Sequence, residues 1–301
     1  MASTPESGFI EEEEDVQDRL AELIPGGVGK AYHNQTMRKH GLFVEFCCSD
    51  NSALKRVTEQ LGIAYFGVTK STVNLDDEEA FEQVLEWLQV EVQDQCGPVH
   101  LWGSVPHTAW SPWQNMALAK YGEPYRIKLE KKRELSRQYV IKFKQAADVV
   151  KMSRGGSVTF GWSKDSSGWK DPVVEQIMEA LELTGVRVDG CSFNLQIHGK
   201  RPQRPWVIKT DNPKLLKELS TKVCKHPQGF HDHLEGSLTV KSGFYNVAMA
   251  TCILATLYPG VMFDKVPAMP VVPFVQHEHR EKHVFESMPS SPVLATIHKL
   301  S

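Results

Sequence analysis

A short polar loop at residues 106–114 carries the side chains best suited to chemistry. Its sequence is Pro-His-Thr-Ala-Trp-Ser-Pro-Trp-Gln, and it follows a short, largely apolar segment at residues 99–105. His107 can exchange a proton near neutral pH, and the indoles can stack on a flat aromatic ligand. We therefore expect this loop to form the active-site edge of an α/β sheet. Two interpretations of His107 stay open: a general base, or a loop histidine without a catalytic role.

A second group of reactive side chains lies within residues 224–233. It offers one thiol and three imidazoles, from Cys224, His226, His231 and His233. Zinc prefers these donors, so the four residues are candidate metal ligands. Their spacing matches no common zinc module, and the alternative is a set of histidines that bind no metal.

Two further sets of side chains are ambiguous in the sequence. Cys47 and Cys48 could supply thiolates, although free cysteines are more often buried by packing. Two roles are open for the tryptophans at the predicted strand ends: they could stack a flat ligand, or they could simply pack the edge of the sheet. These residues are Trp102, Trp110, Trp113, Trp162 and Trp169.

Strands and helices alternate along the chain. Apolar runs predict strands at residues 42–47, 63–68, 99–105, 157–162, 186–195 and 206–210. Helical periodicity and capping residues predict helices at residues 53–61, 76–90, 127–152 and 173–183. This alternation predicts an α/β fold with a doubly wound, mostly parallel sheet, whose site lies in the loops at the carboxyl ends of the strands.

The first predicted strand leads into a polar turn and a helix start. Ser52 or Asn51 can cap the helix, and the free N–H groups of a helix start favour anions and nucleotides. The turn between strand and helix has no glycine, so a dinucleotide fingerprint is absent. Glu45 remains a candidate for holding an adenosyl group.

Composition bounds the class of protein. The 301 residues are 41% hydrophobic, which suits a soluble globular core. We expect an acidic, peripheral tail at residues 1–30, an α/β domain at residues 31–250 and an extension at residues 251–301. No apolar run is long enough for a membrane span, no secretory leader is evident, and six unpaired cysteines favour a reducing, intracellular compartment.

Basic residues gather in two stretches that flank the candidate site. Residues 120–154 hold eleven Lys or Arg against four acids, and residues 196–225 hold eight against two. These stretches could bind nucleic acid or could be ordinary solvated helix faces. The sequence does not give the oligomeric state.

The order of these motifs resembles the cytosine-C5 DNA methyltransferases of the class I, S-adenosylmethionine-dependent fold. Residues 105–111 are similar to the family's Pro-Cys-Gln-x-Phe-Ser loop, and residues 160–162 are placed like its Glu-Asn-Val strand end. Residues 199–208 are similar to its Gly-x-Pro-Gln-x-Arg-x-Arg segment. The chain also resembles a methyltransferase-like family of protist retroelements over nearly its whole length.

This resemblance implies both a cofactor and site residues. S-adenosylmethionine would be bound by Glu45, Phe46, Cys47, Ser49, Thr69, Asn74, Ser104 and Pro106. The catalytic positions would be His107, Ser111, Gly161, Arg201 and Arg204.

Two departures from the family fall on catalytic positions. His107 stands where the family has its cysteine nucleophile, and imidazole is a poor substitute for a thiolate. Gly161 stands where a carboxylate would hold and protonate the pyrimidine. Ordinary C5 methylation should therefore be impaired, and restoring it should require both His107→Cys and Gly161→Glu, with the two side chains converging on one base.

Three functions follow as hypotheses. The first is a methyltransferase-like retroelement domain that keeps binding of S-adenosylmethionine or nucleic acid. The second is a non-enzymatic nucleic-acid-binding module of a retroelement polyprotein, and the third is a zinc-stabilised interaction module.

Overall fold

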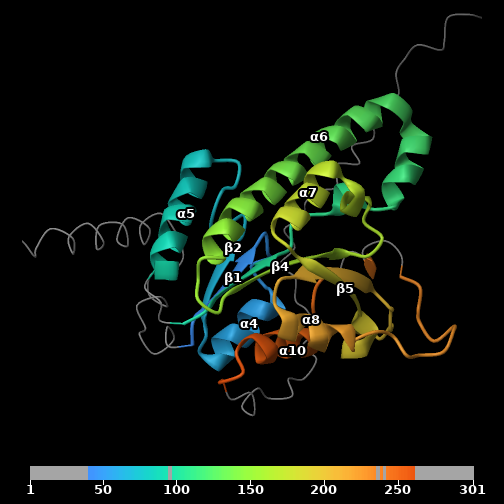
Figure 1. Ribbon diagram of the computed structural model, residues 1–301. Coiled ribbons are helices and arrows are strands. Elements are labelled where there is room, and N and C mark those ends of the chain that lie inside the picture. The colour runs from blue at the N-terminus through green and yellow to red at the C-terminus, as the bar shows by residue number, and fades with distance from the viewer. Residues whose placement is uncertain (1–39, 94–96, 235–237, 240–241, 262–301) are drawn as a thin grey trace, which may run out of the picture. The chain divides into compact units, whose positions relative to one another are not determined.

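Six strands form one mixed sheet in the computed structural model, which describes residues 40–93, 97–234, 238–239 and 242–261 (Figure 1). Their order across the sheet is β2-β1-β3-β4-β6-β5. The strands are β1 Leu42–Phe46, β2 Ala64–Val68, β3 Val99–Gly103, β4 Ser157–Ser163, β5 Thr184–Asp189 and β6 Pro205–Thr210. The first four are parallel neighbours, whereas β6 is antiparallel to both β4 and β5. The expected α/β class with a mostly parallel sheet is confirmed.

Helices cover both faces of this sheet (Figure 1). One face is covered by α5 (Glu78–Gln93), α6 (Trp113–Val150) and α7 (Pro172–Ala180). The other is covered by α4 (Ala53–Leu61), α8 (Pro213–Ser220) and α10 (Val247–Leu257). Each helix buries its apolar side against the strands, so the sheet is the middle layer of three.

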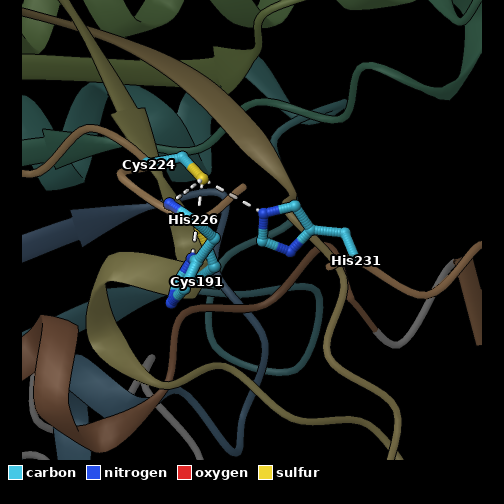
Figure 2. A group of neighbouring side chains, drawn as sticks. All are labelled: Cys191, Cys224, His226 and His231. Atoms are coloured by element: carbon cyan, nitrogen blue, oxygen red, sulfur yellow. Dashed lines mark hydrogen bonds between the residues drawn. The ribbon is translucent and has the colours of Figure 1, made fainter. Parts of the chain in front are cut away.

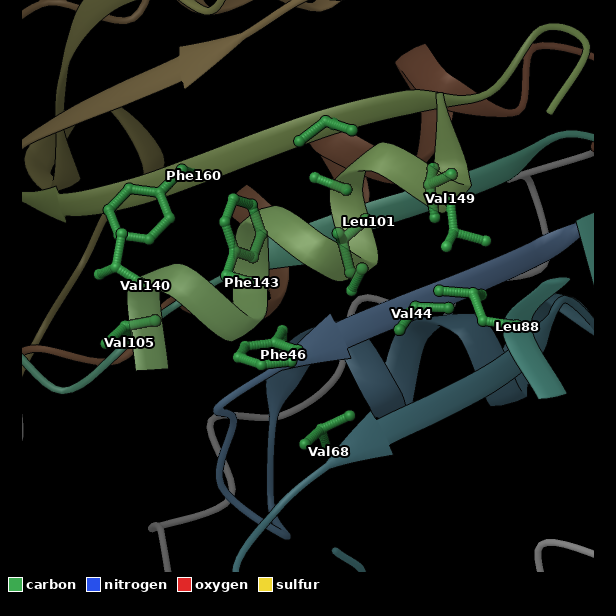
Figure 3. Packing of buried hydrophobic residues seen from close by; sticks show 14 of the residues in the cluster. Val44, Phe46, Val68, Leu88, Leu101, Val105, Val140, Phe143, Val149 and Phe160 are labelled. Atoms are coloured by element: carbon green, nitrogen blue, oxygen red, sulfur yellow. The ribbon is translucent and has the colours of Figure 1, made fainter. Parts of the chain in front are cut away.

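Alternating side chains divide the strands between two cores. Phe46, Leu101 and Phe160 pack with α5 and α6, as Figure 3 shows. Phe43 and Trp102 point the other way and pack with α4 and α10. Because neighbouring strand residues face opposite sides, a strand buried on both faces reads as one apolar run.

Local capping explains where the first helix begins and ends. The Ser52 hydroxyl accepts the Leu54 N–H at 3.1 Å, and Gly62 ends α4 in the left-handed conformation at φ 65°. A serine cap and a terminal glycine are the preferred residues at these two positions. The predicted helix at residues 53–61 and its Ser52 cap are confirmed.

The predicted strand at residues 186–195 is wrong over its second half. Strand β5 ends at Asp189, and a 3-10 helix, η3 (Gly190–Phe193), follows it. A Cβ on Gly190 would lie 2.8 Å from the Leu195 side chain and 2.9 Å from Trp206. The chain turns tightly at this glycine, and the apolar residues beyond it pack inward from a loop rather than from a strand.

Helix α6 begins well before the predicted start at residue 127. It runs from Trp113 and contains a break at Gly122, whose φ and ψ are 62° and −145°. Pro124 follows the break and is compatible with a new helix start. The structure therefore has a short helical arm ahead of the long basic helix.

Helix α10 lies across the predicted domain boundary between residues 250 and 251. Ile253 and Leu254 are fully buried against α4 and the sheet, so the helix belongs to the core of the α/β unit. The acidic tail and the C-terminal tail from residue 262 lie outside the described residues. Within the described part of the chain, no helix combines the length and the apolar character needed to cross a bilayer.

Candidate functional site

The carboxyl ends of β1 and β3 form a topological switch point. The connection after β1 leads to β2 on one side, and the connection after β3 leads to β4 on the other. The Ser104 N–H donates to the Phe46 carbonyl at 2.9 Å, which ties the two strand ends together. In open α/β sheets, ligands bind outside the strands at such a point. The predicted loop at residues 106–114 lies at this edge.

The Glu45 side chain is held by two neighbouring hydroxyl groups. Its side chain is 3% exposed, and its two oxygens accept hydrogen bonds from Ser52 and Tyr65, each at 2.9 Å. Gly67 leaves room for the Tyr65 hydroxyl, since a Cβ there would lie 2.8 Å from it. Burial raises the pKa of Glu45 to about 7, against the lowering effect of both hydrogen bonds. Glu45 is therefore a buried acid, each of whose oxygens accepts one hydrogen bond.

The cysteines after β1 are packing residues rather than thiolates. Burial raises the pKa of both Cys47 and Cys48 above the ordinary range. The Cys48 sulfur lies 3.4 Å from the Tyr65 hydroxyl, and Cys47 has a left-handed φ of 60°. Neither thiol is available as an ionised nucleophile near neutral pH.

His107 lies directly before the 3-10 helix η1 (Thr108–Trp110) and has its ring 6.5 Å from that of Trp162. Burial, together with the charge of Arg204, lowers the pKa of His107 to about 4. His107 is thus neutral at physiological pH. A neutral imidazole can accept a proton or a hydrogen bond.

Arg204 is the main cation beside His107. It adopts a left-handed φ of 44°, and burial lowers the pKa of its guanidinium. Its Nε is buried and has no hydrogen-bond partner among the described residues. The negative charge of Asp165 acts in the opposite direction and raises the pKa of Arg204. A buried guanidinium with an unused donor is suited to an anionic or carbonyl group of a ligand.

The hydroxyl of Tyr245 lies at the position that a side chain on Gly161 would occupy. A Cβ on Gly161 would be 2.6 Å from that hydroxyl oxygen. Burial raises the pKa of Tyr245 to about 12, while contact with Ser104 and the charge of Arg204 lower it. Tyr245 comes from the segment before α10, so the sequence pattern gave no sign of it. It joins His107 and Arg204 as the third polar residue of this edge.

The other predicted site residues lie in different parts of the structure. Arg201 lies over the Phe230 ring, with its guanidinium carbon 5.9 Å from the ring centroid. Ser111 ends η1 and accepts the Trp113 N–H at 3.4 Å. Phe46 lies in the core, and hydrogen bonds within local turns hold Ser49, Thr69 and Asn74. Pro106 is exposed, and its carbonyl accepts the Ser136 hydroxyl at 3.1 Å.

The tryptophans do not form an open aromatic floor. Trp102, Trp110 and Trp162 are buried, and the Trp162 N–H donates to the Val105 carbonyl at 2.6 Å. Trp110 is flanked by the guanidinium groups of two arginines on α6. These indoles pack the sheet edge, whereas Trp113 is 53% exposed at the start of α6.

The two basic stretches lie on several elements, and Lys209 of the second stretch lies over the Trp169 ring at 5.4 Å. Helix α6 covers one face of the sheet, and α8, with its lysines, covers the other. Several cations of the first stretch are also paired internally, for example Arg137 with Glu130 and Asp171. The exposed lysines Lys128, Lys131 and Lys132 have no ion pair among the described residues.

A compact cluster of Cys and His side chains lies beside the loop between β5 and β6 (Figure 2). It contains Cys191, Cys224, His226 and His231, whose potential ligand atoms all lie within 4.8 Å of one another. Three of these residues were predicted as ligands, whereas His233 is not in the cluster and its place is taken by Cys191. This cluster could hold a metal ion.

Neighbouring groups orient the members of this cluster. The Cys224 sulfur lies 3.1 Å from His231 Nε2 and 3.6 Å from His226 Nδ1. The other ring nitrogen of His231 lies 3.3 Å from the Arg201 carbonyl. The His226 ring stacks on Phe230 with centroids 4.1 Å apart. Such outer contacts fix the ring orientation of metal-binding histidines.

Comparison with known proteins does not assign the chain to a family. No protein-family model matches the chain, and no curated protein matches it significantly.

Proposed function

We propose that this chain is a doubly wound domain of the class I methyltransferase type, from a retroelement polyprotein. It binds S-adenosylmethionine and nucleic acid at the carboxyl edge of the sheet and is impaired in cytosine-C5 methylation. The alternation of strands and helices, the sheet order and the helices on both faces are compatible with this type of fold. The sequence resemblance supplies the proposed cofactor and origin.

The observation that carries the proposal is the group formed by Arg204, His107 and Tyr245 at the switch point. The Tyr245 hydroxyl lies against Gly161 of β4, and the His107 ring lies 6.5 Å from that of Trp162, the next residue of the same strand. The charge of Arg204 lowers the pKa of both His107 and Tyr245. The buried, unused Nε of Arg204 is a donor that lacks an acceptor. An anionic group of a ligand, either a carboxylate or a phosphate, would supply it.

The chemistry of this group favours binding over methyl transfer to cytosine. A neutral imidazole at His107 cannot match a thiolate as the nucleophile toward a pyrimidine ring. At Gly161, the Tyr245 hydroxyl takes the place of the missing carboxylate, and its raised pKa keeps it protonated. Both replacements remove groups that the family reaction requires.

Titration calorimetry with S-adenosylmethionine and with a short single-stranded oligonucleotide tests the proposal. Arg204→Ala should weaken binding by about 10- to 150-fold, since a charged hydrogen bond contributes ~1.5–3 kcal/mol. Arg56→Ala, an exposed change on α4, is the matched control and should leave affinity unchanged. If Arg204→Ala weakens binding of S-adenosylmethionine alone, Arg204 binds the carboxylate of that ligand. If it weakens binding of the oligonucleotide alone, Arg204 binds a phosphate. A wild-type chain that binds neither contradicts the proposal.

A metal-stabilised interaction module is the second candidate function. The cluster of Cys191, Cys224, His226 and His231 supports it. Two sulfur and two imidazole donors favour Zn²⁺ over hard cations such as Mg²⁺ or Ca²⁺. Elemental analysis of the purified full chain tests this candidate directly.

A further inference from the structure

We propose that one Zn²⁺ ion, held by Cys191, Cys224, His226 and His231, fastens the loop between β5 and β6 and thereby positions Arg204. This inference deepens the metal-binding candidate and does not require any ligand at the switch point. Four protein donors would leave no open position on the ion, which is typical of a structural zinc site.

The spacing of the donors suits a zinc ion. Zinc–sulfur and zinc–nitrogen bonds of about 2.3 and 2.0–2.1 Å place neighbouring donors of a tetrahedral site about 3.3–3.8 Å apart. The Cys224 sulfur lies 3.6 Å from His226 Nδ1 and 3.1 Å from His231 Nε2. All the donor atoms lie within 4.8 Å of one another. Side-chain shifts of about 1 Å would bring them to the spacing of a tetrahedral zinc site.

The donors come from two separate loops. Cys191 belongs to η3, directly after β5. Cys224, His226 and His231 come from the segment that follows α8, and Figure 2 shows their side chains meeting Cys191. An ion shared by both loops would add a cross-link beside Asp189, whose N–H donates to the Lys222 carbonyl at 2.9 Å and whose carboxylate accepts the Cys224 N–H at 2.8 Å.

Backbone hydrogen bonds lead from this cluster to Arg204. The Cys191 N–H donates to the Gln203 carbonyl at 3.2 Å, and the neighbouring Gly190 N–H donates to the Arg204 carbonyl at 2.9 Å. On the other side, the Arg201 N–H donates to Asp232 Oδ2 at 2.7 Å. Both ends of residues 201–204 are therefore attached to segments that carry the proposed ligands.

Arg204 needs such support because of its own conformation. Its left-handed φ of 44° is unfavourable for a residue with a Cβ, and its Nε is buried without a hydrogen-bond partner among the described residues. A conformation of this kind persists only where the surrounding structure holds it. The proposed zinc ion is that restraint.

Metal analysis and cobalt substitution test the ligand set. The full chain expressed with zinc should contain one Zn²⁺ per molecule, and the Co²⁺ form should show the absorption bands of a tetrahedral cobalt thiolate. Cys191→Ser should remove one thiolate contribution from these bands and lower the metal content. His233→Ala and Cys252→Ser, which lie outside the cluster, are matched controls and should change neither. A chain without stoichiometric metal, or equal losses in His233→Ala and Cys191→Ser, overturns the proposed site.

Hydrogen exchange tests the positioning role separately. Removing the ion with a chelator should speed exchange of the Gly190 and Cys191 amides by about tenfold or more, because both donate to residues 203–204. The Ser104 amide, which joins β3 to β1, should stay unchanged as an internal control. Unchanged exchange at residues 190–191 after complete metal removal overturns the positioning role while leaving the metal site intact. Because neither readout uses S-adenosylmethionine or nucleic acid, failure of the ligand proposal would be seen independently.

Discussion

Single residues at the carboxyl edge combine burial with unusual polarity, and Glu45 is the clearest case. Its carboxyl group is enclosed by Ser52 and Tyr65, and burial raises its pKa from 4.5 to about 7. The folded chain therefore holds a proton that the unfolded chain releases above pH 4.5. Stability from this group is present at low pH and is lost as pH rises toward 7.

Glu45→Gln should remove the loss of stability that Glu45 causes as pH rises. Relative to the wild type, the variant should gain up to ~3 kcal/mol in the free energy of unfolding between pH 4.5 and pH 8, at ~1.4 kcal/mol per pH unit. Urea unfolding of both proteins at several pH values measures the difference. His100 and His107 have lowered pKa values, so their contribution to the free energy of unfolding rises with pH. This contribution is the same in both proteins and cancels in the difference. A difference that does not change with pH would contradict the raised pKa of Glu45.

Gly161 and Tyr245 should be energetically coupled. Gly161→Ala should cost about 1–3 kcal/mol, because the new methyl group meets the Tyr245 hydroxyl. Tyr245→Phe removes that oxygen and leaves the next ring atom 3.9 Å away, so the double variant should recover most of the loss. Thermal unfolding of the four proteins gives the coupling energy. Additive effects would mean that the two residues do not touch.

This contact changes the expected repair of the catalytic positions. Gly161→Glu with His107→Cys leaves Tyr245 where the new carboxylate would have to lie. A repaired site therefore requires Tyr245→Ala as a third change. The sequence could not show this, because Tyr245 is brought to β4 by the segment before α10.

At the scale of single elements, helix α6 offers the clearest surface for nucleic acid. Trp113, Met116, Tyr121 and Ile127 are exposed along its first half, and three unpaired lysines follow them. Aromatic stacking together with cations is the usual combination for binding single strands. The helix starts at the carboxyl edge, directly after the His107 loop.

Replacing Lys128, Lys131 and Lys132 with alanine should weaken binding to single-stranded nucleic acid and flatten its salt dependence. Three lost phosphate contacts correspond to a decrease of about 2 in the slope of log K against log salt concentration. Fluorescence anisotropy at several salt concentrations measures this slope. Lys214→Ala with Lys217→Ala on α8, on the opposite face, provides the control. A larger effect from the α8 pair would place the surface on the other side of the sheet.

Elements defined by local signals were predicted well. The cap at Ser52, the glycine at the end of α4 and the apolar runs of β1 and β3 are all properties of neighbouring residues. Features that depend on distant contacts were missed. Cys191 enters the metal cluster only because the turn at Gly190 brings it beside Cys224 and His231.

At the scale of the whole molecule, the core extends past the predicted boundary at residue 250. Ile253, Leu254 and Leu257 of α10 are buried in the second core. A chain ending at residue 250 should fail to fold, since losing each large apolar side chain costs about 2–5 kcal/mol against a total stability of ~5–15 kcal/mol. A chain ending at residue 261 should melt cooperatively. Circular dichroism melts of both proteins decide the point, and equal melting of the two would show that α10 is dispensable.

The position of β6 between β4 and β5 has a consequence for synthesis. The ribosome delivers β5 before β6, yet β5 reaches the sheet only through β6. While residues 205–210 are still being made, the outer backbone groups of β4 have no partner, and an unpaired strand edge invites pairing with other chains. Strands β5 and β6 can therefore join the sheet only after β6 has emerged from the ribosome.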